Sequence, residues 1–368
     1  MTLDSWLESA SSGWKPLPLS LRNAETVEEL VQRGLSSIRQ DLGHATTLAD
    51  YAARISRMLN DPKLIGLTLR LKGHTKLLSG RSRAAVRLYE AARIAFHEFP
   101  DERAATAIPM LQALSYVGDY QRVFDTAQEA LNYFQEVGDD LRAARVEANL
   151  ANALHRLDRL TEARDCFQRS IDTLAEHNAT ADLAIVMRNF GVVLMGLQDY
   201  ESAAALYARA RANFEAEGLT SLVLEVDLNH AYLLGRKGHL RDALVCYRNL
   251  QDQFSEANSF ELGHCLLDQA DFMLEIGLWT DAEVAARRAY EIFTELQLRF
   301  ERGKAKLLMS VALLRKGHIH IASEGFKEAR TSLRGEPNLI WQALARQAFA
   351  ELYELKGWDR RAVAELKR

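Results

Sequence analysis

The chain has 368 residues, of which 48% are hydrophobic and 26% charged, and its formal net charge is −4. This composition excludes an intrinsically disordered chain, and the lack of a basic excess argues against a protein that binds nucleic acid directly. The three cysteines form no CxxC motif and are expected to be buried thiols in a reducing compartment. Neither a secretory signal nor an apolar run of about 18 residues is present, so we expect a cytoplasmic protein without a membrane span.

The first 63 residues are predicted to differ from the rest of the chain. Residues 1–24 are expected to form an irregular arm, because Pro16 and Pro18 in "WKPLPLS" disfavour a helix. Residues 25–63 have the apolar spacing of one degenerate helix pair.

From residue 64 onward, a short turn motif recurs about every forty residues, eight times in all. An alanine follows the turn residue by five positions in seven of the eight copies, and an aromatic residue often comes four positions later. Apolar residues recur at spacings of three and four on both sides of the turn, which predicts helices. A turn residue of this kind must accept a left-handed backbone. The eight turn residues are Gly80, Gly118, Asp158, Gln198, Gly238, Gly277, Gly317 and Gly357.

Each copy is therefore predicted to be a helix, a tight turn and a second helix. One such pair cannot bury its own apolar face, so that successive pairs must stack. The pattern, best seen in "FGVVLMGLQDYESAAALYARA" (residues 190–210), resembles the tetratricopeptide repeat in a forty-residue variant. The resemblance implies an all-α, right-handed superhelix of about eight or nine helix pairs. Its regular part would cover residues 64–368, with the last repeat incomplete, and the first helix of each pair would line a concave surface.

Two stretches resemble a narrower group, the repeats that precede the caspase-like peptidase domain of bacterial CHAT proteins. They are "DPKLIGLTLRLKGHTKLLSGRSRAAVRLYEAARIAF" and "LDQADFMLEIGLWTDAEVAARRAYEIF". This resemblance implies a region that regulates or recruits partners for such a domain. The catalytic His and Cys of the family have no matching motif here, so no catalytic residue is predicted. Because the sequence stops partway through a second helix, we expect either a longer protein or another chain that covers this end.

Asparagine occupies one position of the first helix in three successive repeats, nine residues before the turn residue, although asparagine is a poor residue for a helix interior. These are Asn149, Asn189 and Asn229, and Asp268 follows at the same position. A primary amide can pair with a peptide N–H and C=O together. Repeats about 10 Å apart would present one amide to about every third residue of an extended peptide. The family resemblance places this position on the concave face, but the amides could instead cap or bridge neighbouring helices.

Other residues of the first helices complete the predicted peptide-binding set. They are Arg145, Asn152, His155, Arg156, Arg188, Tyr232 and Arg236. This mainly basic set suits an acidic or carboxylate-bearing peptide, although each arginine could simply be a solvated surface residue. Farther along the chain the same face is predicted to carry His264, Asp271, Glu275, Lys304 and Arg315.

The sequence predicts a binding protein without chemistry of its own. It has no glycine-rich phosphate loop, and the pair His318 and His320 lacks an evident third metal ligand, so no cofactor and no metal are expected. The leading hypothesis is a protein- or peptide-binding region that regulates a caspase-like domain. The alternatives are the ligand-sensing region of a bacterial transcription regulator and a plain assembly scaffold.

Overall fold

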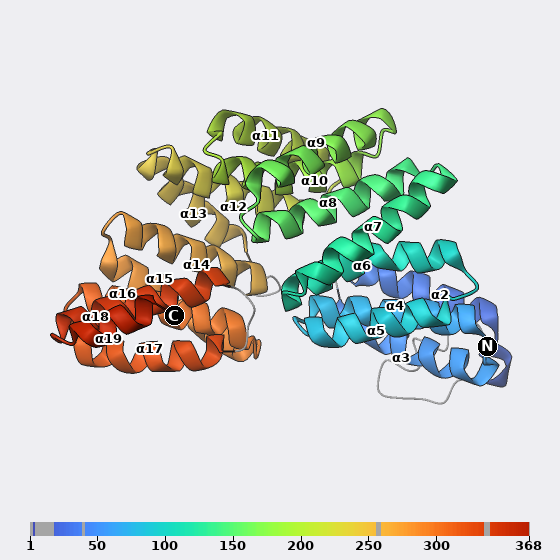
Figure 1. Ribbon diagram of the computed structural model, residues 1–368, viewed down its shortest axis with the longest axis horizontal. Coiled ribbons are helices and arrows are strands. Elements are labelled where there is room, and N and C mark those ends of the chain that lie inside the picture. The colour runs from blue at the N-terminus through green and yellow to red at the C-terminus, as the bar shows by residue number, and fades with distance from the viewer. Residues whose placement is uncertain (1–2, 4–17, 39–40, 255–258, 335–338, 368) are drawn as a thin grey trace. The chain divides into compact units, whose positions relative to one another are not determined.

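The computed structural model describes residues 3, 18–38, 41–254, 259–334 and 339–367, and these residues form helices joined by short turns (Figure 1). No β-strand occurs in these ranges, which confirms the predicted all-α class. None of the helices in the described ranges is long and apolar enough to cross a membrane. The chain divides into two compact units, Met1–His177 and Asn178–Arg368, a division that the sequence analysis does not predict.

The first unit contains four helix pairs, preceded by a short 3₁₀ helix, η1 (Leu19–Leu21). Most of the predicted irregular arm lies outside the described residues. The paired helices are α2 (Ala24–Ser37), α3 (Leu42–Leu59), α4 (Pro62–Leu78), α5 (Ser82–Ala95), α6 (Pro100–Val117), α7 (Tyr120–Val137), α8 (Asp140–Arg156) and α9 (Leu160–Glu176).

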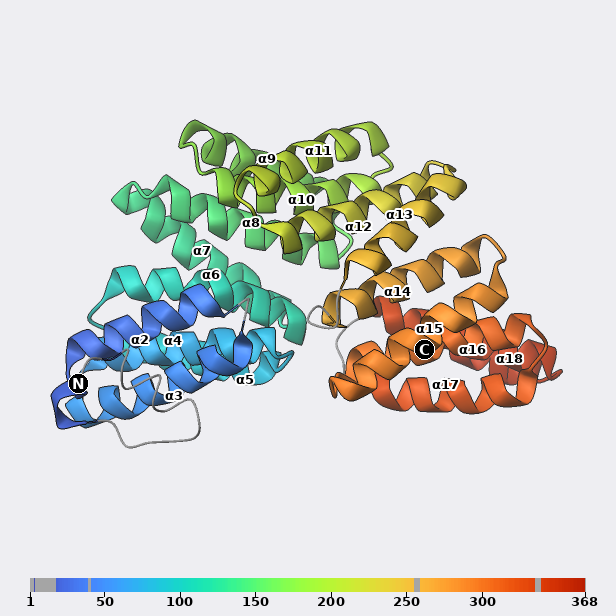
Figure 2. The same cartoon turned by 180° about the vertical axis from the view of Figure 1, so that it is seen from behind.

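The second unit continues the same alternation over its described residues (Figure 2). Its helices are α10 (Thr180–Gly196), α11 (Tyr200–Ala216), α12 (Thr220–Arg236), α13 (Leu240–Gln253), α14 (Ser259–Glu275), α15 (Trp279–Glu295), α16 (Arg299–Arg315), α17 (Ile319–Leu333), α18 (Leu339–Leu355) and α19 (Asp359–Leu366).

All eight predicted turn residues have the left-handed backbone that the repeat requires, which confirms the register. Where the residue is not glycine, φ is 59° at Asp158 and 61° at Gln198. The turn after α10 shows how the chain ends a helix: the N–H of Asp199 donates to the carbonyl of Leu194 at 2.9 Å, and that of Gln198 to Met195 at 3.1 Å. These bonds satisfy carbonyls that would otherwise lack partners at the helix end.

One small change in this turn is expected to stabilise the protein. Because a left-handed backbone brings the Cβ atom of Gln198 close to the following carbonyl, Gln198→Gly should raise the free energy of unfolding by about 0.5–1 kcal/mol. Chemical denaturation of the full chain measures the change. Gln198→Asn should fall between the two, and Gln198→Val should be less stable than the wild type, since a β-branched residue adopts this conformation poorly. Equal stability in all four proteins would contradict the explanation.

The alanine and aromatic positions of the repeat form the seam between the two helices of each pair. The alanines are inaccessible to solvent, as Ala163 and Ala203 illustrate, and Phe167 and Tyr207 beside them are also buried. At the best copy of the motif, the ring of Tyr207 occupies the space that a side chain at Gly191 would fill, since a Cβ atom there would lie 2.3 Å from Cε1 of the ring. The apolar seam predicted from the sequence is thus confirmed.

Within each unit, the first helices of the pairs form one layer and the second helices another. Each first helix packs against the first helix of the next pair, as α4 does against α6 and α12 against α14. The second helices pack mainly against helices adjacent in the chain, such as α13 against α12 and α14. Because successive first helices approach one another more closely, each unit bends toward their layer. The first helices therefore form its inner face.

Candidate functional site

The repeated asparagine position lies on these first helices. Asn149 lies on α8 in the first unit, whereas Asn189 and Asn229, followed by Asp268, lie on α10, α12 and α14 of the second. All four side chains are half-buried. The surroundings of the four side chains differ.

Asn149 and Asn189 already have partners within their own units. The Asn149 amide nitrogen donates to the carbonyl of Arg145, one turn earlier in α8, at 2.9 Å. The Asn189 carbonyl oxygen accepts from the guanidinium of Arg188, at 3.3 Å from Nη2 and 3.4 Å from Nε. Arg188 also forms an ion pair with Glu225 on the next first helix, α12. These two amides therefore retain only part of their hydrogen-bonding capacity for a ligand.

Asn229 and its neighbours on α14 are different, because the described residues supply no hydrogen-bond or ion-pair partner for Asn229, Asp268 or Asp271. Asn229 and Asp268 occupy equivalent positions on two first helices that pack together. Tyr232, one turn beyond Asn229, is 37% exposed. This part of the inner face presents one amide and two carboxyl groups that can still accept or donate hydrogen bonds.

Burial changes the acidity of the two carboxyl groups. It raises the pKa of Asp268 to about 7, with Asp271 adding to the rise and Lys304 opposing it. Burial also raises the pKa of Asp271 to about 6, and Glu275 raises it further. A positive charge placed beside such a carboxyl group would favour its ionised form.

The two basic side chains that come near Asp268 differ in charge: Lys304 is charged and acts on Asp268 without an ion pair to it, whereas His264 is neutral. Lys304 on α16 places its ammonium 4.7 Å from the centroid of the Phe300 ring and 5.3 Å from that of Trp341. His264 packs edge-on against Phe293, and burial lowers its imidazole pKa to about 3, so the ring is neutral at physiological pH. Of the arginines predicted on this face of the second unit, Arg188 is paired with Glu225 and Arg236 lies near Glu275.

The buried hydroxyl of Tyr247, on which Asp268 acts electrostatically, also lacks a hydrogen-bond partner. Tyr247 on α13 is fully buried, and its hydroxyl oxygen forms no hydrogen bond within the described chain. Burial raises the pKa of this phenol, and the charge of Asp268 raises it further, which places the hydroxyl in the electric field of the carboxyl cluster. Nothing in the sequence pattern distinguishes Tyr247 from the other aromatic residues at its position in the repeat.

The other predicted site residues fall into two groups. In the first unit, Arg156 places its guanidinium 4.4 Å from the centroid of the Tyr116 ring, and burial lowers the pKa of His155. Asn152 precedes both residues on α8 and is half-buried, and Arg145 is exposed. Tyr116, on α6, is an aromatic neighbour that the sequence analysis misses.

In the second unit, Arg236 lies 3.7 Å from a carboxylate oxygen of Glu275, so that two residues predicted on this face partly neutralise each other. The charge of Arg236 also opposes the burial that raises the pKa of Tyr232.

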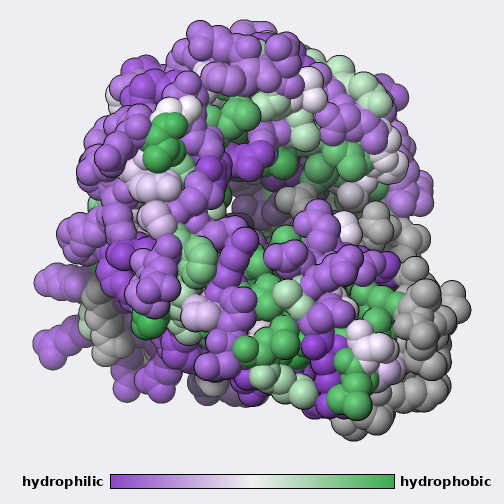
Figure 3. All heavy atoms as spheres, turned by 90° about the vertical axis from the view of Figure 1, so that its right-hand side faces the viewer, coloured by the Kyte–Doolittle hydropathy of each residue, from purple (hydrophilic) through white to green (hydrophobic). Residues whose placement is uncertain are grey.

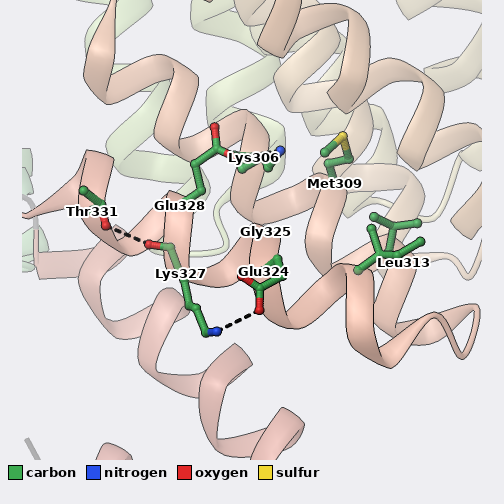
Figure 4. Close-up of a pocket in the computed structure, with 9 residues that line it drawn as sticks. Lys306, Met309, Leu313, Glu324, Gly325, Lys327, Glu328 and Thr331 are labelled. Carbon is green, nitrogen blue, oxygen red and sulfur yellow. Dashed lines mark hydrogen bonds and ion pairs between the residues drawn. The ribbon is translucent and has the colours of Figure 1, made fainter.

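One depression lies away from these residues. It has a volume of about 430 Å³ and opens between α16 and α17 (Figure 4). Its wall combines apolar groups, such as Met309 and Leu313, with charged ones, such as Lys306. No residue of the predicted peptide-binding set lines it. Within the described ranges, no three His, Cys, Asp or Glu side chains gather as metal ligands.

The surface gives no sign of a large apolar interface on the face drawn in Figure 3. Hydrophilic residues cover most of that face, and hydrophobic ones form small separate patches.

Comparison with known proteins supports the repeat assignment. Residues 140–216 match the tetratricopeptide repeat family model. A search of curated protein sequences finds no match. The tetratricopeptide match covers two complete helix pairs, α8–α9 and α10–α11.

Solved structures with the same fold extend the likeness over nearly the whole chain. NprR in complex with its cognate peptide NprX is 11% identical, with a TM-score of 0.59, and the match covers 93% of this chain and 87% of NprR. A Rap protein complexed with Competence and Sporulation Factor is 14% identical, with a TM-score of 0.58, over 100% and 90% of the two chains. The Rap conjugation gene regulator of plasmid pLS20, in complex with the Phr* peptide, is 13% identical, with a TM-score of 0.51, over 93% of each chain. At these identities the likeness shows the fold alone.

Proposed function

We propose that this protein binds an extended peptide or a peptide segment of a partner protein on the inner face of its first helices, and that it has no chemistry of its own. The observation that carries the proposal is the unpartnered amide of Asn229, in register with the unpartnered carboxyl of Asp268 on the next first helix. A peptide backbone offers the N–H and C=O groups that such an amide pairs with. The complexes of NprR with its cognate peptide NprX and of a Rap conjugation gene regulator with the Phr* peptide, both of the same fold, support this proposal.

Two effects of peptide binding have support. The likeness of two stretches to CHAT repeats supports regulation of a caspase-like peptidase domain. The fold shared with a Rap conjugation gene regulator supports a peptide sensor that controls transcription. Sequencing the gene and its neighbours separates them, since a peptidase domain encoded there supports the first and a helix-turn-helix domain the second.

The proposal predicts that removing the three amides weakens peptide binding. Affinity selection from a synthetic library of random heptapeptides is expected to recover peptides with the wild type and at least about tenfold less with an Asn149/Asn189/Asn229→Ala triple variant, since each lost hydrogen bond contributes about 0.5–1.5 kcal/mol. Among the single variants, Asn229→Ala should lose most, because the other two amides are already partly used. The control is Asn249→Ala, at an exposed position on α13 in the outer layer.

The same experiment distinguishes binding from a structural role. Equal recovery by the triple variant, at unchanged stability, would contradict peptide binding through the amides. A triple variant that unfolds would instead favour helix bridging as the role of these residues.

A further inference from the structure

We propose that Asp268 and Asp271 form a subsite for a cationic group of the ligand, either the side chain of a lysine or arginine or the free amino terminus of a peptide. This inference deepens the peptide-binding proposal and rests on it. It replaces, for the second unit, the expectation of an acidic ligand.

The first argument is a contrast among the carboxylates of the second unit. Those at the surfaces between its helices have basic partners, as shown by Glu225 with Arg188, Asp227 with Arg211 at 2.7 Å, and Glu283 with Lys316 at 2.9 Å. Asp268 and Asp271 have no such partner among the described residues, although both are half-buried. A half-buried carboxylate without a partner is costly, and most proteins avoid it.

The second argument is the buried hydroxyl of Tyr247. A buried polar atom without a partner is uncommon in folded proteins and calls for an explanation. This hydroxyl is on a fully buried side chain, and the charges of Asp268 and Asp271 both act on it. A ligand ammonium or guanidinium has several N–H donors, so that it can bond to the carboxylates and leave one donor for this oxygen.

The third argument is the wall beside the two carboxyl groups. The half-exposed ring of Tyr232 lies within the electric field of Asp268, Asp271 and Glu275. An aromatic face next to carboxylates favours a cation, through attraction to the ring and to the negative charges together. Asn229 lies one turn before Tyr232 on α12 and remains available for the ligand backbone. The carboxyl groups would then recognise the charge of the ligand, and Asn229 its main chain.

The test uses three synthetic pentapeptides that differ only in charge. They are acetyl-AAKAA-amide, with a lysine side chain; AAMAA-amide, with a free amino terminus; and acetyl-AAMAA-amide, with neither. Binding to the full chain is measured by titration calorimetry at pH 8. At least one cationic peptide should bind about tenfold tighter than the neutral one, and the peptide that does so identifies the source of the cation.

The variant Asp268→Asn/Asp271→Asn should abolish this preference, whereas Asp252→Asn, at an exposed position on outer helix α13, should leave it unchanged. Asparagine already occupies the Asp268 position in the preceding repeats, and circular dichroism checks the fold. Tyr247→Phe removes the buried hydroxyl alone. It should lower the affinity for the cationic peptide about threefold and raise the midpoint of thermal unfolding.

The possible failures are distinguishable. Equal binding of all three peptides to the wild type, or a preference that survives in the double variant, overturns the cation subsite and leaves peptide binding intact. Absence of binding by every pentapeptide, together with an empty selection from the heptapeptide library, contradicts both proposals.

Discussion

Replacing Tyr207 with alanine is expected to lower the free energy of unfolding by about 3–5 kcal/mol, the cost of emptying a large buried aromatic site. Tyr207 is 2% exposed and fills the seam between α10 and α11. The loss should be near the upper end of this range, because Gly191 opposite the ring has no side chain with which to fill the void. The shift of the guanidinium unfolding midpoint measures it.

The protein itself contains the control for this prediction. One repeat of the first unit has the opposite arrangement, with Leu111 where Gly191 stands and Ala127 where Tyr207 stands, and both residues are buried. Each of the changes Gly191→Leu and Tyr207→Ala should be destabilising alone. In the double variant the loss of unfolding free energy should be about 2 kcal/mol smaller than the sum of the two single losses. If the two single effects on the free energy of unfolding simply add, the leucine side chain does not fill the space left by the tyrosine ring, and the prediction is wrong.

Raising the pH from 4 to 8 is expected to destabilise the protein through Asp268, by an amount on the order of a few kcal/mol. In the unfolded chain this carboxyl ionises near its ordinary pKa, about 3.9, whereas in the folded protein its pKa is about 7. Between these values the folded state binds the extra proton, so the free energy of unfolding falls as the pH rises. Asp271 contributes in the same direction over a narrower range that ends near pH 6.

The measurement compares the wild type with Asp268→Asn at each pH. Above pH 7 the variant should be the more stable protein. At pH 4 the difference should be much smaller, because the wild-type carboxyl is then protonated in the folded state and about half protonated in the unfolded state. Groups that do not interact with Asp268 are common to both proteins and cancel in the difference. Asp271, Lys304, Tyr232 and Tyr247 interact with its charge, so the pH dependence of the difference belongs to this coupled cluster. A difference that does not change with pH would contradict the raised pKa of Asp268.

The sequence was sufficient for the repeating framework, since the features that define it are local. A left-handed turn at Gly118 or Gln198 and a buried alanine such as Ala203 depend on spacing within one helix pair. Those constraints recur every forty residues, so each copy reinforces the register of the others. The division between His177 and Asn178 interrupts no such spacing, and the sequence pattern gives no signal of it.

The charges of the candidate site could not be predicted in the same way, because they depend on which side chains meet across neighbouring repeats. Arg188 appears as a free cation in the sequence, yet it pairs with Glu225, 37 residues later. Asp268 appears as a variant of the asparagine position, and only packing shows that burial changes its acidity. The asparagine register was predictable from spacing, whereas the availability of each amide was not.

The layered contacts described above also bear on how the chain is made. A helix of this protein packs chiefly on the one or two helices that follow it, so a growing chain can bury each seam soon after it leaves the ribosome. Proteins whose contacting residues are close in sequence fold quickly, so they expose little apolar surface before folding is complete. Synthesis and assembly of the helix pairs can therefore proceed in the same order, from the amino end to the carboxyl end.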